Sequence, residues 1–400
     1  MQYPQRFSEL PEYAFPRLRT LLDDHQPGGE VLHMSIGEPT HPFPDFVGEI
    51  LAANLKGFNK YPPTDGTPEL RQAIASWLEM RFDLKRVNPD KHVVSLNGTR
   101  EGLFNAALAL CPEEKNGKRP VVLLPNPFYQ CYAVAAIAAG AEPIYVPALP
   151  ENAFLPDFAG LPQDVLERTA LVYMCSPSNP QGAVASAKYW KKLVQLAEIH
   201  DFRVLADECY SEIYRDKPPA GALKATQDAG VSRERVLVFH SLSKRSNLPG
   251  LRSGFAAGGK KTIAAIKKLR AYTGAPIPLP IQMVSAAAWA DEIHVEQNRE
   301  LYKRKFDISD RVFAKRSGYR SPDAGFFLWL NVGNGETAAL KLWQETGIRA
   351  LPGEYLSRDT ETGNPGWAYL RVALVADQVS VERGLRLIDD CLGDKMDKTE

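Results

Sequence analysis

The stretch RVLVFHSLSKRSNLPGLRSGF, residues 235–255, decides the fold because it joins a buried strand to a cluster of polar residues. Its opening apolar run has the length of a strand, and Ser241, Ser243 and Lys244 follow directly, with Arg252 after a Pro-Gly turn. A lysine at the end of a buried strand is costly unless its ammonium is solvated, paired or chemically engaged. A solvated lysine after a strand-to-turn transition and a chemically engaged lysine are both consistent with this stretch alone.

Five other apolar runs resemble the opening of that stretch. They are HVVSLNG at 92–98, PVVLLP at 120–125, EPIYVP at 142–147, ALVYMCS at 170–176 and FRVLAD at 202–207. Helical segments separate them, including one that begins with Thr67 as N-cap and Pro68 in its first turn. Continuous apolar strands alternating with helices are typical of a parallel sheet that is buried on both faces. The sequence therefore predicts an α/β fold with a mostly parallel sheet.

The pattern of alternating strands and helices ends at about residue 280, and long amphipathic helices are predicted after it. We therefore expect a large α/β domain over residues 46–284. Residues 1–45 and 285–400 are expected to form a smaller α+β domain.

Composition narrows the functional class. The 400 residues carry 48 basic and 48 acidic side chains, so no net charge attracts nucleic acid or an anionic membrane. The five cysteines are widely spaced and form neither a disulfide framework nor a zinc site. The N-terminus has no apolar signal core, and no apolar stretch reaches the roughly 20 residues of a membrane span. A cytoplasmic enzyme is expected.

Polar residues follow the predicted strands, where ligands bind in open α/β sheets. In SLNGTREG, Gly98, Thr99 and Arg100 stand where a strand becomes a helix, which suits either a phosphate or a simple helix cap. In PNPFYQCY, Tyr129 follows a strand and a proline turn, where it either covers a planar ligand or is only half-buried. In CSPSNPQG, Asn179 lies in a rigid turn that aims its amide inward or serves the turn alone.

Charged residues interrupt two further apolar runs. VLADECY ends a strand with Asp207 and continues to Tyr210. A carboxylate at the end of an apolar strand needs a cation or a hydrogen-bond donor as its partner. That partner belongs either to a ligand or to a structural salt bridge within the protein. YLRVALV holds Arg371 inside a strand, where a guanidinium usually pairs with a carboxylate of the protein or of a ligand. A lysine, a buried acid and a phosphate site together are what pyridoxal phosphate requires, since a lysine amine forms a Schiff base with its aldehyde. We find no nucleophile–base pair and no histidine cluster for a metal.

The order and spacing of these motifs resemble the class I/II aminotransferases, from SIGEP at 35–39 to LRVAL at 370–374. That resemblance implies the aspartate-aminotransferase-like fold, pyridoxal-phosphate fold type I. MSIGEPTHP, NGTREGLF, PNPFYQCY, DECYSEIY and FHSLSKRSNLPGLRSGF are similar, more closely, to the N-succinyldiaminopimelate aminotransferases of proteobacteria, enzymes of lysine biosynthesis. Glutamate as amino donor and N-succinyl-2-amino-6-oxopimelate as acceptor follow from this second resemblance.

The resemblance also implies a role for each motif residue. Lys244 is expected to be the Schiff-base lysine and proton shuttle, and Asp207 the partner of the pyridine nitrogen. Asn179 and Tyr210 are expected at the ring 3-oxygen, and Tyr129 is expected to stack on the ring. The implied phosphate cup consists of Gly98, Thr99, Arg100, Ser241, Ser243 and Arg252.

Further implications concern the substrate and a second subunit. Arg371 and the backbone of Gly37 are expected to clamp the substrate's α-carboxylate together with Asn179, and Tyr61 is expected to reach the phosphate of a partner subunit in a homodimer. The resemblance also implies a cis Asn179–Pro180 bond. The usual NP-T-G turn reads NPQG here, and Gln181 is expected to face away from the ring.

Two other motifs point elsewhere, and one question stays open. GFAAGGKKT at 254–262 nearly matches a P-loop but lacks the Ser or Thr that binds magnesium. NVGNGETA at 331–338 fits a dinucleotide fold, but about sixty residues follow, too few for the remaining units, so a glycine-rich strand–helix turn is favoured. A nicotinamide-dependent oxidoreductase is the alternative from a different class. Arg245 and Arg17 are candidates for the distal end of the substrate, but the sequence places neither.

Overall fold

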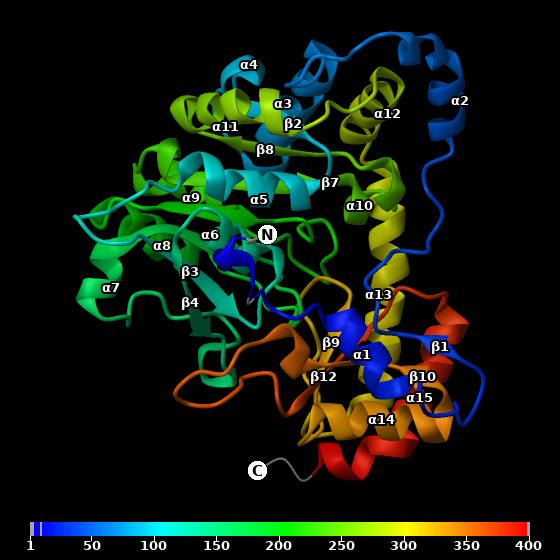
Figure 1. The fold of residues 1–400 in the computed structure, drawn as a ribbon. Helices are drawn as coiled ribbons and strands as arrows, with labels where there is room; N and C mark the ends of the chain where they lie inside the picture. Colours follow the sequence, from blue (N-terminus) through cyan, green and yellow to red (C-terminus); the bar gives the residue numbers. More distant parts are fainter. Residues whose placement is uncertain (1–3, 9, 398–400) are drawn as a thin grey trace.

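The computed structural model describes residues 4–8 and 10–397. A seven-stranded sheet fills one half of the molecule and two smaller sheets lie in the other half (Figure 1). The strands of the large sheet are β2 Val93–Leu96, β3 Val121–Asn126, β4 Glu142–Pro147, β5 Thr169–Cys175, β6 Arg203–Asp207, β7 Val236–Ser241 and β8 Gly254–Gly258.

The large sheet has the strand order β2-β8-β7-β6-β5-β3-β4. Its five strands from β7 to β4 are parallel, and only β8 runs antiparallel to its neighbours β2 and β7. The six apolar runs of the sequence are β2 to β7, so the predicted mostly parallel α/β sheet is confirmed. In such a sheet the carboxyl ends of the parallel strands meet at one edge.

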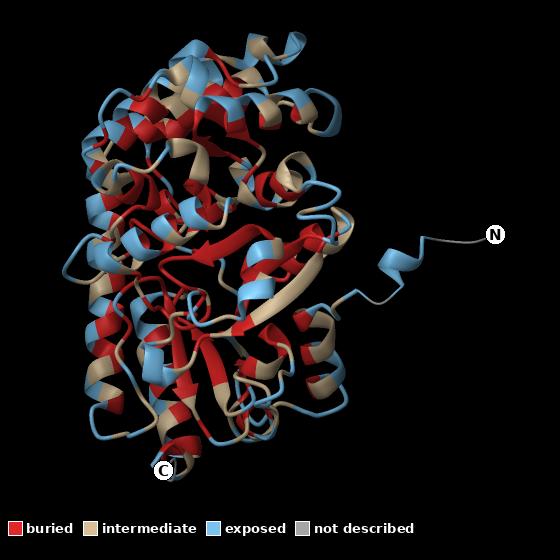
Figure 2. Ribbon diagram, turned by 90° about the vertical axis from the view of Figure 1, so that its left-hand side faces the viewer, coloured by how far each residue is buried: buried red, intermediate tan, exposed pale blue. Residues whose placement is uncertain are grey.

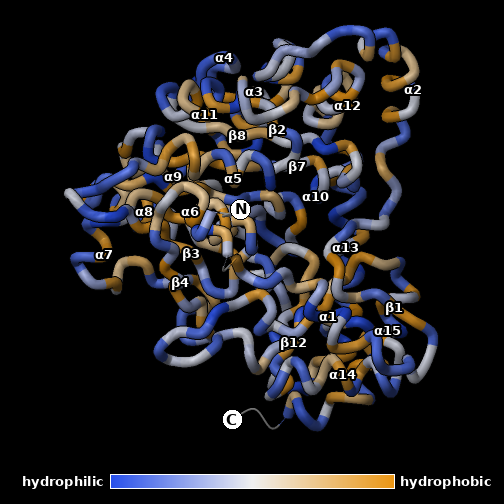
Figure 3. The backbone as a smooth tube through the Cα atoms, viewed as in Figure 1, coloured by the Kyte–Doolittle hydropathy of each residue, from blue (hydrophilic) through white to orange (hydrophobic). Residues whose placement is uncertain are grey.

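Helices cover both faces of this sheet because alternate strand residues point to opposite sides. In β6, Val204 and Ala206 join one buried apolar cluster, while Leu205 joins the cluster on the other face. The first cluster includes α3 Pro68–Phe82, α8 Ala187–Ile199, α9 Ala222–Ala229 and α12 Leu279–Ala290, and the second includes α5 Thr99–Leu110, α6 Cys131–Ala138 and α11 Lys260–Thr273. Hydrophobic residues accordingly follow the strands and the inner sides of the helices (Figure 3).

The helix predicted from Thr67 is α3. The Thr67 hydroxyl accepts a hydrogen bond from the backbone N–H of Leu70 at 3.3 Å, and Pro68 occupies the first turn. This is the N-cap arrangement that the sequence predicts.

Strand β8 is a strand that the sequence analysis missed, because GFAAG has little of the β-branched character of its neighbours. The small residues have a geometric reason. A Cβ on Gly254 or Gly258 would lie 2.6 Å from the carbonyl oxygen of His240 or Val236 on β7. The P-loop-like pattern of residues 254–262 is thus a close-packed strand followed by α11.

The two smaller sheets come from the ends of the chain. One pairs β1 Leu32–His33 with β10 Ile348–Arg349, and the other has the antiparallel order β11-β12-β9, with β11 Leu351–Pro352, β12 Tyr369–Ala373 and β9 Phe327–Asn331. The helices that accompany them are α1 Ala14–Leu22, α13 Ile293–Phe313, α14 Gly335–Thr346 and α15 Gln378–Met396. Leu330, Leu342 and Leu385 lie in their shared core.

The glycine-rich motif at 331–338 is the turn between β9 and α14. The Asn334 side chain accepts the N–H of Thr337 at 2.8 Å and so caps the helix. Because β9 pairs only with antiparallel β12, the motif is a strand–helix turn, as the sequence analysis favours, and not part of a dinucleotide fold.

All strands of the large sheet lie between residues 93 and 258, and the strands of the smaller sheets lie at 32–33 and 327–373. The division into residues 46–284 and residues 1–45 with 285–400 stays a prediction. Residue 284 falls inside α12, which packs on α3 through the core of the large sheet. We propose the same two domains with the boundary moved to the end of α12.

The remaining elements are short. They are α2 Phe46–Ala53, α4 Pro89–His92, α7 Gln163–Arg168 and α10 Leu242–Arg245, with 3₁₀ turns η1 Gln5–Phe7, η2 Leu55–Asn59, η3 Pro150–Asn152, η4 Arg233–Arg235, η5 Pro249–Leu251 and η6 Gly353–Leu356. Within residues 4–8 and 10–397, no helix combines the length and apolar character that a membrane crossing needs.

Candidate active site

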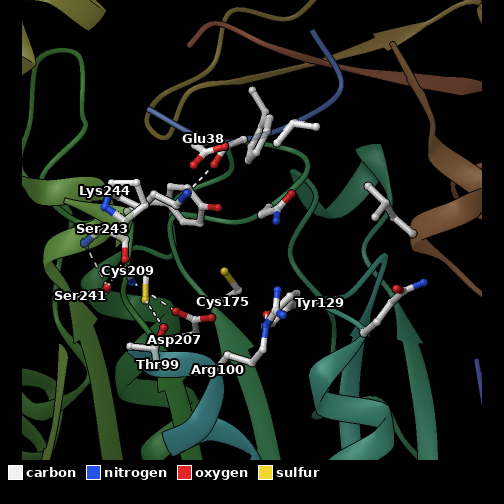
Figure 4. Close-up of a pocket in the computed structure, with 18 of the residues that line it drawn as sticks. Glu38, Thr99, Arg100, Tyr129, Cys175, Asp207, Cys209, Ser241, Ser243 and Lys244 are labelled. Atoms are coloured by element: carbon white, nitrogen blue, oxygen red, sulfur yellow. Dashed lines mark hydrogen bonds between the residues drawn. The ribbon is translucent and has the colours of Figure 1, made fainter. Parts of the chain in front are cut away.

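A cavity of about 550 Å³ opens at the carboxyl ends of the parallel strands (Figure 4). It brings together twelve of the predicted site residues: Gly37, Thr99, Arg100, Tyr129, Asn179, Asp207, Tyr210, Ser241, Ser243, Lys244, Arg252 and Arg371. We call the part built on the large sheet its sheet side, which carries Thr99, Asp207, Ser241, Ser243 and Lys244. The part built from the N-terminal region, residues 36–42 and β12 is its cover side, which carries Tyr13, Gly37, Glu38 and Arg371.

Lys244 lies in the short helix α10, directly after β7. Its ammonium donates a hydrogen bond to the carbonyl oxygen of Gly37 and lies 5.3 Å from the centre of the Phe326 ring. Burial lowers the pKa of Lys244 to about 8, against smaller opposing effects of Cys209 and Glu38. A substantial fraction of this amine is therefore uncharged near neutral pH, which is the form that reacts with an aldehyde.

Asp207 ends β6 and points into the cavity (Figure 4). Its Oδ2 accepts a hydrogen bond from the Tyr132 hydroxyl at 2.7 Å, and its Oδ1 accepts one from the Cys209 N–H at 3.3 Å. Burial keeps the pKa of Tyr132 well above its usual value, so this phenol remains a donor. The Tyr132 ring stacks on Tyr173 at 4.5 Å, which fixes the direction of the donor. The carboxylate is thus held rigidly with further lone pairs to offer.

An anion cradle lies beside Lys244. The Ser241 hydroxyl donates to that of Ser243 at 2.9 Å and accepts the Ser243 N–H at 3.1 Å. Arg252 donates to the Pro249 carbonyl at 2.8 Å and leaves its guanidinium at the cavity. Hydroxyl groups, a guanidinium and the start of α5 provide the donors that a phosphate group needs.

Gly98 does not itself line the cavity but makes the cradle possible. It has a left-handed φ of +80°, and a Cβ there would lie 2.5 Å from Nη2 of Arg252. Arg252 also has a positive φ, of +55°. A side chain at residue 98 would therefore displace the guanidinium from the cradle.

Arg100 and Tyr129 form a pair at the edge of the cavity. The Arg100 Nε donates to the Tyr129 hydroxyl, and the guanidinium carbon lies 5.7 Å from the centre of the Tyr129 ring. The pKa of Arg100 is raised, chiefly by this phenol, and burial raises the pKa of Tyr129. Arg100 therefore orients the aromatic ring that the sequence predicts to stack on a planar ligand, whereas the resemblance implies a place in the phosphate cup.

Arg371 is a buried cation on β12, with 4% of its surface exposed. It donates to the side-chain oxygen of Asn179 at 2.9 Å and to the Ser35 carbonyl at 2.6 Å, and its Nε has no hydrogen-bond partner in the described part of the chain. Burial lowers the pKa of Arg371 to about 10, so it stays charged at neutral pH. Neither acceptor is a carboxylate. A buried charge left without a counter-ion is costly, which indicates a site for an anionic ligand.

Gly37 and Tyr210 line the same cavity as Arg371. A Cβ on Gly37 would lie 2.4 Å from the Phe327 ring, so only glycine lets residue 37 bring its backbone over Lys244. Tyr210 is buried, with its ring edge-on to Phe326 at 5.3 Å. Burial raises its pKa well above the usual value, and the phenol therefore stays a hydrogen-bond donor.

Tyr61 lies outside the cavity of this chain and is 100% exposed. Its expected contact is with a second subunit and stays a prediction. Arg245 faces away from the cavity, where it pairs with Glu292 beneath Trp289. Arg17 stacks on Tyr355 at 3.8 Å and does not line the cavity either. Neither arginine therefore lines the cavity of this chain, and the residues that would bind the distal end of the substrate stay unassigned.

Within the part of the chain that the structure describes, three peptide bonds before proline are cis: Asn126–Pro127, Ser176–Pro177 and Asn179–Pro180. The last was expected and the other two were not. Gln181 is buried but does not line the cavity, in keeping with the expectation for this departure from the common turn.

The sequence analysis missed several cavity residues, of which Tyr13, Glu38, Gln130, Tyr132 and Cys209 matter most. Tyr132 stands in the quoted motif PNPFYQCY, where a polar side chain within the apolar helix α6 was a usable signal. Gln130 precedes that helix, and its partners lie far away in the sequence. Glu38 stands in the quoted motif SIGEP, although its side chain was not singled out, and Tyr13 lies outside every quoted motif. Among residues 4–8 and 10–397, no cluster of three or more His, Cys, Asp or Glu could hold a metal ion.

Comparisons with known proteins agree with this geometry. The chain matches the family described as aminotransferase class I and II over residues 29–386. An LL-diaminopimelate aminotransferase from Dehalococcoides mccartyi is 34% identical over 395 residues, which cover 96% of this chain and 97% of that protein. The crystal structure of an aminotransferase from Neisseria meningitidis is 40% identical with a TM-score of 0.92, covering 97% of this chain and 99% of that one. The crystal structure of the aminotransferase AspB from Helicobacter pylori is 36% identical with a TM-score of 0.89, covering 98% of this chain and 100% of that one.

Proposed function

Since this chain belongs to the class I and II aminotransferases, which depend on pyridoxal 5'-phosphate, we propose that it moves an amino group between glutamate and a keto acid with a diaminopimelate skeleton. The observation that carries the proposal is the buried, uncompensated Arg371 in one cavity with Lys244 and Asp207. The nicotinamide-dependent alternative finds no support in the family match or in the antiparallel β9–β12 pairing.

The residues of the cavity fit the cofactor. Ser241, Ser243 and Arg252 would hold its phosphate beside the start of α5, where Gly98 leaves the necessary space. Asp207 would accept a hydrogen bond from the protonated pyridine nitrogen, with the lone pairs that Tyr132 and Cys209 leave free. Tyr129 would cover the ring, held by Arg100.

When bound, the cofactor supplies an aldehyde that condenses with amines and a ring that withdraws electrons from the adjacent carbon. We assign to Lys244 the proton transfer: its amine would take the proton from the substrate's α-carbon and deliver it to the carbon that carries the cofactor's aldehyde, C4′. Burial favours this role, because a lysine with a pKa of about 8 exchanges protons readily near neutral pH. Asp207 supports the same step, since a fixed negative charge keeps the ring nitrogen protonated.

Arg371 would bind the substrate's α-carboxylate through a paired hydrogen bond. In this structure its guanidinium reaches the oxygen of Asn179 and the Ser35 carbonyl, both neutral acceptors. An arriving carboxylate would supply the missing negative charge. Gly37 offers its backbone on the same side, next to the Lys244 amine.

We also propose a homodimer with shared sites. Phe58 and Tyr272 are exposed aromatic residues, as is Tyr61. The turn η1 projects from the surface of the molecule beside α6, and none of its residues is buried (Figure 2). Exposed aromatic residues and a projecting segment both support a contact with a second copy. In that arrangement Tyr61 would reach the partner's phosphate cradle.

The second substrate, which exchanges an amino group with the glutamate and 2-oxoglutarate pair, is the most specific part of the proposal. A keto acid would accept the amino group from glutamate, whereas LL-diaminopimelate would donate one to 2-oxoglutarate. The motif resemblance favours N-succinyl-2-amino-6-oxopimelate, whereas the named relative at 34% identity favours an unsuccinylated LL-diaminopimelate substrate. Both carry a carboxylate beyond the α-position, and a cavity of about 550 Å³ is within the size range of small-molecule sites. We propose the succinylated keto acid first and LL-diaminopimelate second.

The test measures kcat/KM for the succinylated keto acid, oxaloacetate and pyruvate with glutamate as donor, and for LL-diaminopimelate with 2-oxoglutarate. A pocket built for the succinyl amide leaves polar groups unpaired when that arm is missing, so the succinylated acid should exceed the others by about 10²-fold or more. A clear preference for LL-diaminopimelate selects the second candidate. A preference for oxaloacetate or an aromatic keto acid rejects the diaminopimelate assignment and leaves the aminotransferase assignment intact.

A further inference from the structure

Lys305 is a buried lysine outside the cavity that the chemistry proposed above does not use. It lies on α13 with 1% of its surface exposed. Its ammonium has three N–H donors and three acceptors: Nε2 of His41 at 2.7 Å and the carbonyl oxygens of Leu374 at 3.0 Å and Val375 at 3.2 Å. Burial lowers the pKa of Lys305 to about 7, and its amino group, charged or neutral, meets only neutral acceptors. The group therefore joins three segments of chain at one point through hydrogen bonds.

The orientation of the His41 ring follows from its other neighbour. Nδ1 lies 2.8 Å from the side-chain oxygen of Asn298, which also accepts from the Asn247 amide at 3.1 Å. Because an amide oxygen only accepts, Nδ1 of His41 carries the proton and Nε2 is free to accept from Lys305. Burial, helped by the charge of Lys305, lowers the pKa of His41 and favours this neutral ring. The ring lies 4.6 Å from that of Tyr302.

This network reaches the active site by two routes. The Asn298 amide donates to the backbone carbonyl of Lys244 at 3.4 Å. The other route runs through residues 36–42, which we call the cover segment: the Asn247 amide donates to the carbonyl of Pro42 at 3.1 Å. Farther along the same segment, the carbonyl of Gly37 accepts the hydrogen bond of the Lys244 ammonium.

The cover segment has one more side-chain bond to the same place. The Thr40 hydroxyl donates to the carbonyl of Val375 at 2.6 Å, an oxygen that Lys305 also contacts. The charged and titratable groups around Lys305 are His41 from the cover segment, Tyr302 on its own helix, and Asp377, the N-cap of α15. None of them is a carboxylate in contact with the ammonium among the described residues, so hydrogen bonds and not an ion pair hold the junction together.

We propose that Lys305 is a positioning residue, which holds His41 and with it the cover segment over Lys244, so that the reactive amine stays buried and faces the Gly37 carbonyl. The inference rests on the proposed function only in taking Lys244 as the reactive lysine. Removing the ammonium of Lys305 leaves His41 and two carbonyl groups without a donor, and the cover segment should then loosen. Water would reach Lys244, and the pKa that burial lowers would return toward the ordinary value of a lysine.

The test uses the full-length chain as Lys305→Met and His41→Phe variants, with Lys303→Met as the matched control. Methionine keeps the unbranched apolar stem, and phenylalanine keeps the ring beside Tyr302. Lys303 is on the same helix and only half-buried. The cofactor-free protein is acylated with acetic anhydride across pH, and peptide mass spectrometry follows Lys244. Thermal unfolding of each variant is recorded in parallel.

In the parent and in Lys303→Met, half-maximal acylation of Lys244 should fall near pH 8. In Lys305→Met and His41→Phe it should move upward by about one pH unit, since Lys244 regains water. With cofactor added, the same two variants should raise KM for the amino acid several-fold while changing kcat less, because the cover segment no longer presents its backbone to the substrate.

Unchanged acylation of Lys244 in both variants, even with a lower Tm, would overturn the proposal, since Lys305 would then only stabilise the fold. If Lys305→Met does not fold, His41→Phe together with Thr40→Val decides the question in the same way. The acylation readout needs no turnover. A parent enzyme inactive on every substrate tried would therefore reject the proposed function without affecting this inference.

Discussion

The two sides of the cavity are built differently. On the sheet side, Asp207 and Ser241 are the last residues of strands whose backbones are fixed by the ladder of a seven-stranded sheet. On the cover side, Gly37 and Tyr13 lie in loops held by side-chain hydrogen bonds that join distant parts of the chain. Under the proposed function, the sheet side would carry the chemistry on a rigid frame. The cover side would carry binding on a frame with fewer constraints, and it should be the easier one to disturb.

The largest expected effect comes from the sheet side. Lys244→Ala should lower transamination by about 10³-fold or more, since both the reactive amine and the proton carrier are lost. Lys261→Ala, an exposed lysine of α11, is the control and should match the parent. Steady-state rates measure the loss. Borohydride reduction of the loaded parent followed by peptide mapping should place the pyridoxyl group on Lys244, and finding it on any other lysine would refute the assignment.

Asp207→Asn comes second. The amide keeps the shape but removes the charge that holds the proton of the ring nitrogen, so kcat should fall by about 10²- to 10³-fold. Tyr132→Phe should have a smaller effect, because it removes only one hydrogen bond to the Asp207 carboxylate, and kcat should fall about tenfold. Single-turnover rates with glutamate measure both. An Asp207→Asn rate within a few-fold of the parent would mean that Asp207 is structural.

The pH dependence of Lys244 acylation tests how well the cover side keeps water from the sheet side. A lysine whose pKa is lowered to about 8 is uncharged above that pH, whereas an exposed lysine becomes uncharged only above about 10.4. At pH 7 the cofactor-free protein should therefore acylate at Lys244 on the order of 10²-fold faster than a free lysine would, after correction for access. Exposed Lys188 provides the internal reference. Equal pH midpoints for the two lysines would show that the cover does not exclude water.

The smallest expected effect tests the cover side alone. The amide of Gln130 donates to the carbonyl of Glu12 at 2.7 Å and its oxygen accepts the N–H of Ala14, which fastens the N-terminal region at the cavity. Gln130→Leu should raise KM about fivefold with little change in kcat, in keeping with hydrogen bonds worth about 1 kcal/mol each. Gln163→Leu, on the surface of α7, is the control. A fall in kcat with unchanged KM would contradict a binding role for this contact.

The same contrast explains what the sequence revealed. Asp207 and Lys244 could be predicted because each follows a continuous apolar strand, a local pattern with a known consequence for position. Gln130, Tyr13 and Lys305 could not, because their partners lie 116 residues away for Gln130 and 264 residues away for Lys305. Nothing in a local pattern encodes such pairs.

Strand β8 and Arg100 show two other limits. The glycines of β8 are determined by the approach of β7, a tertiary contact that outweighs their poor strand propensity. Arg100 lies at the cavity, but its side chain bonds to Tyr129, and rotamer choice in a polar cavity is not visible in the sequence. Arg371 could be singled out from its apolar strand, whereas Gly37 depended on the family resemblance.

The close approach of Gly98 to Arg252 has a consequence for how this chain can vary. Any Cβ at residue 98 would stand 2.5 Å from Nη2 of Arg252, and both residues hold left-handed backbone. In a library of random variants selected for activity, residue 98 should therefore stay glycine as long as residue 252 stays arginine. A substitution at 98 would survive only beside a smaller residue at 252, and that pair would have lost the guanidinium of the cradle. Selection for activity should therefore act on residues 98 and 252 together.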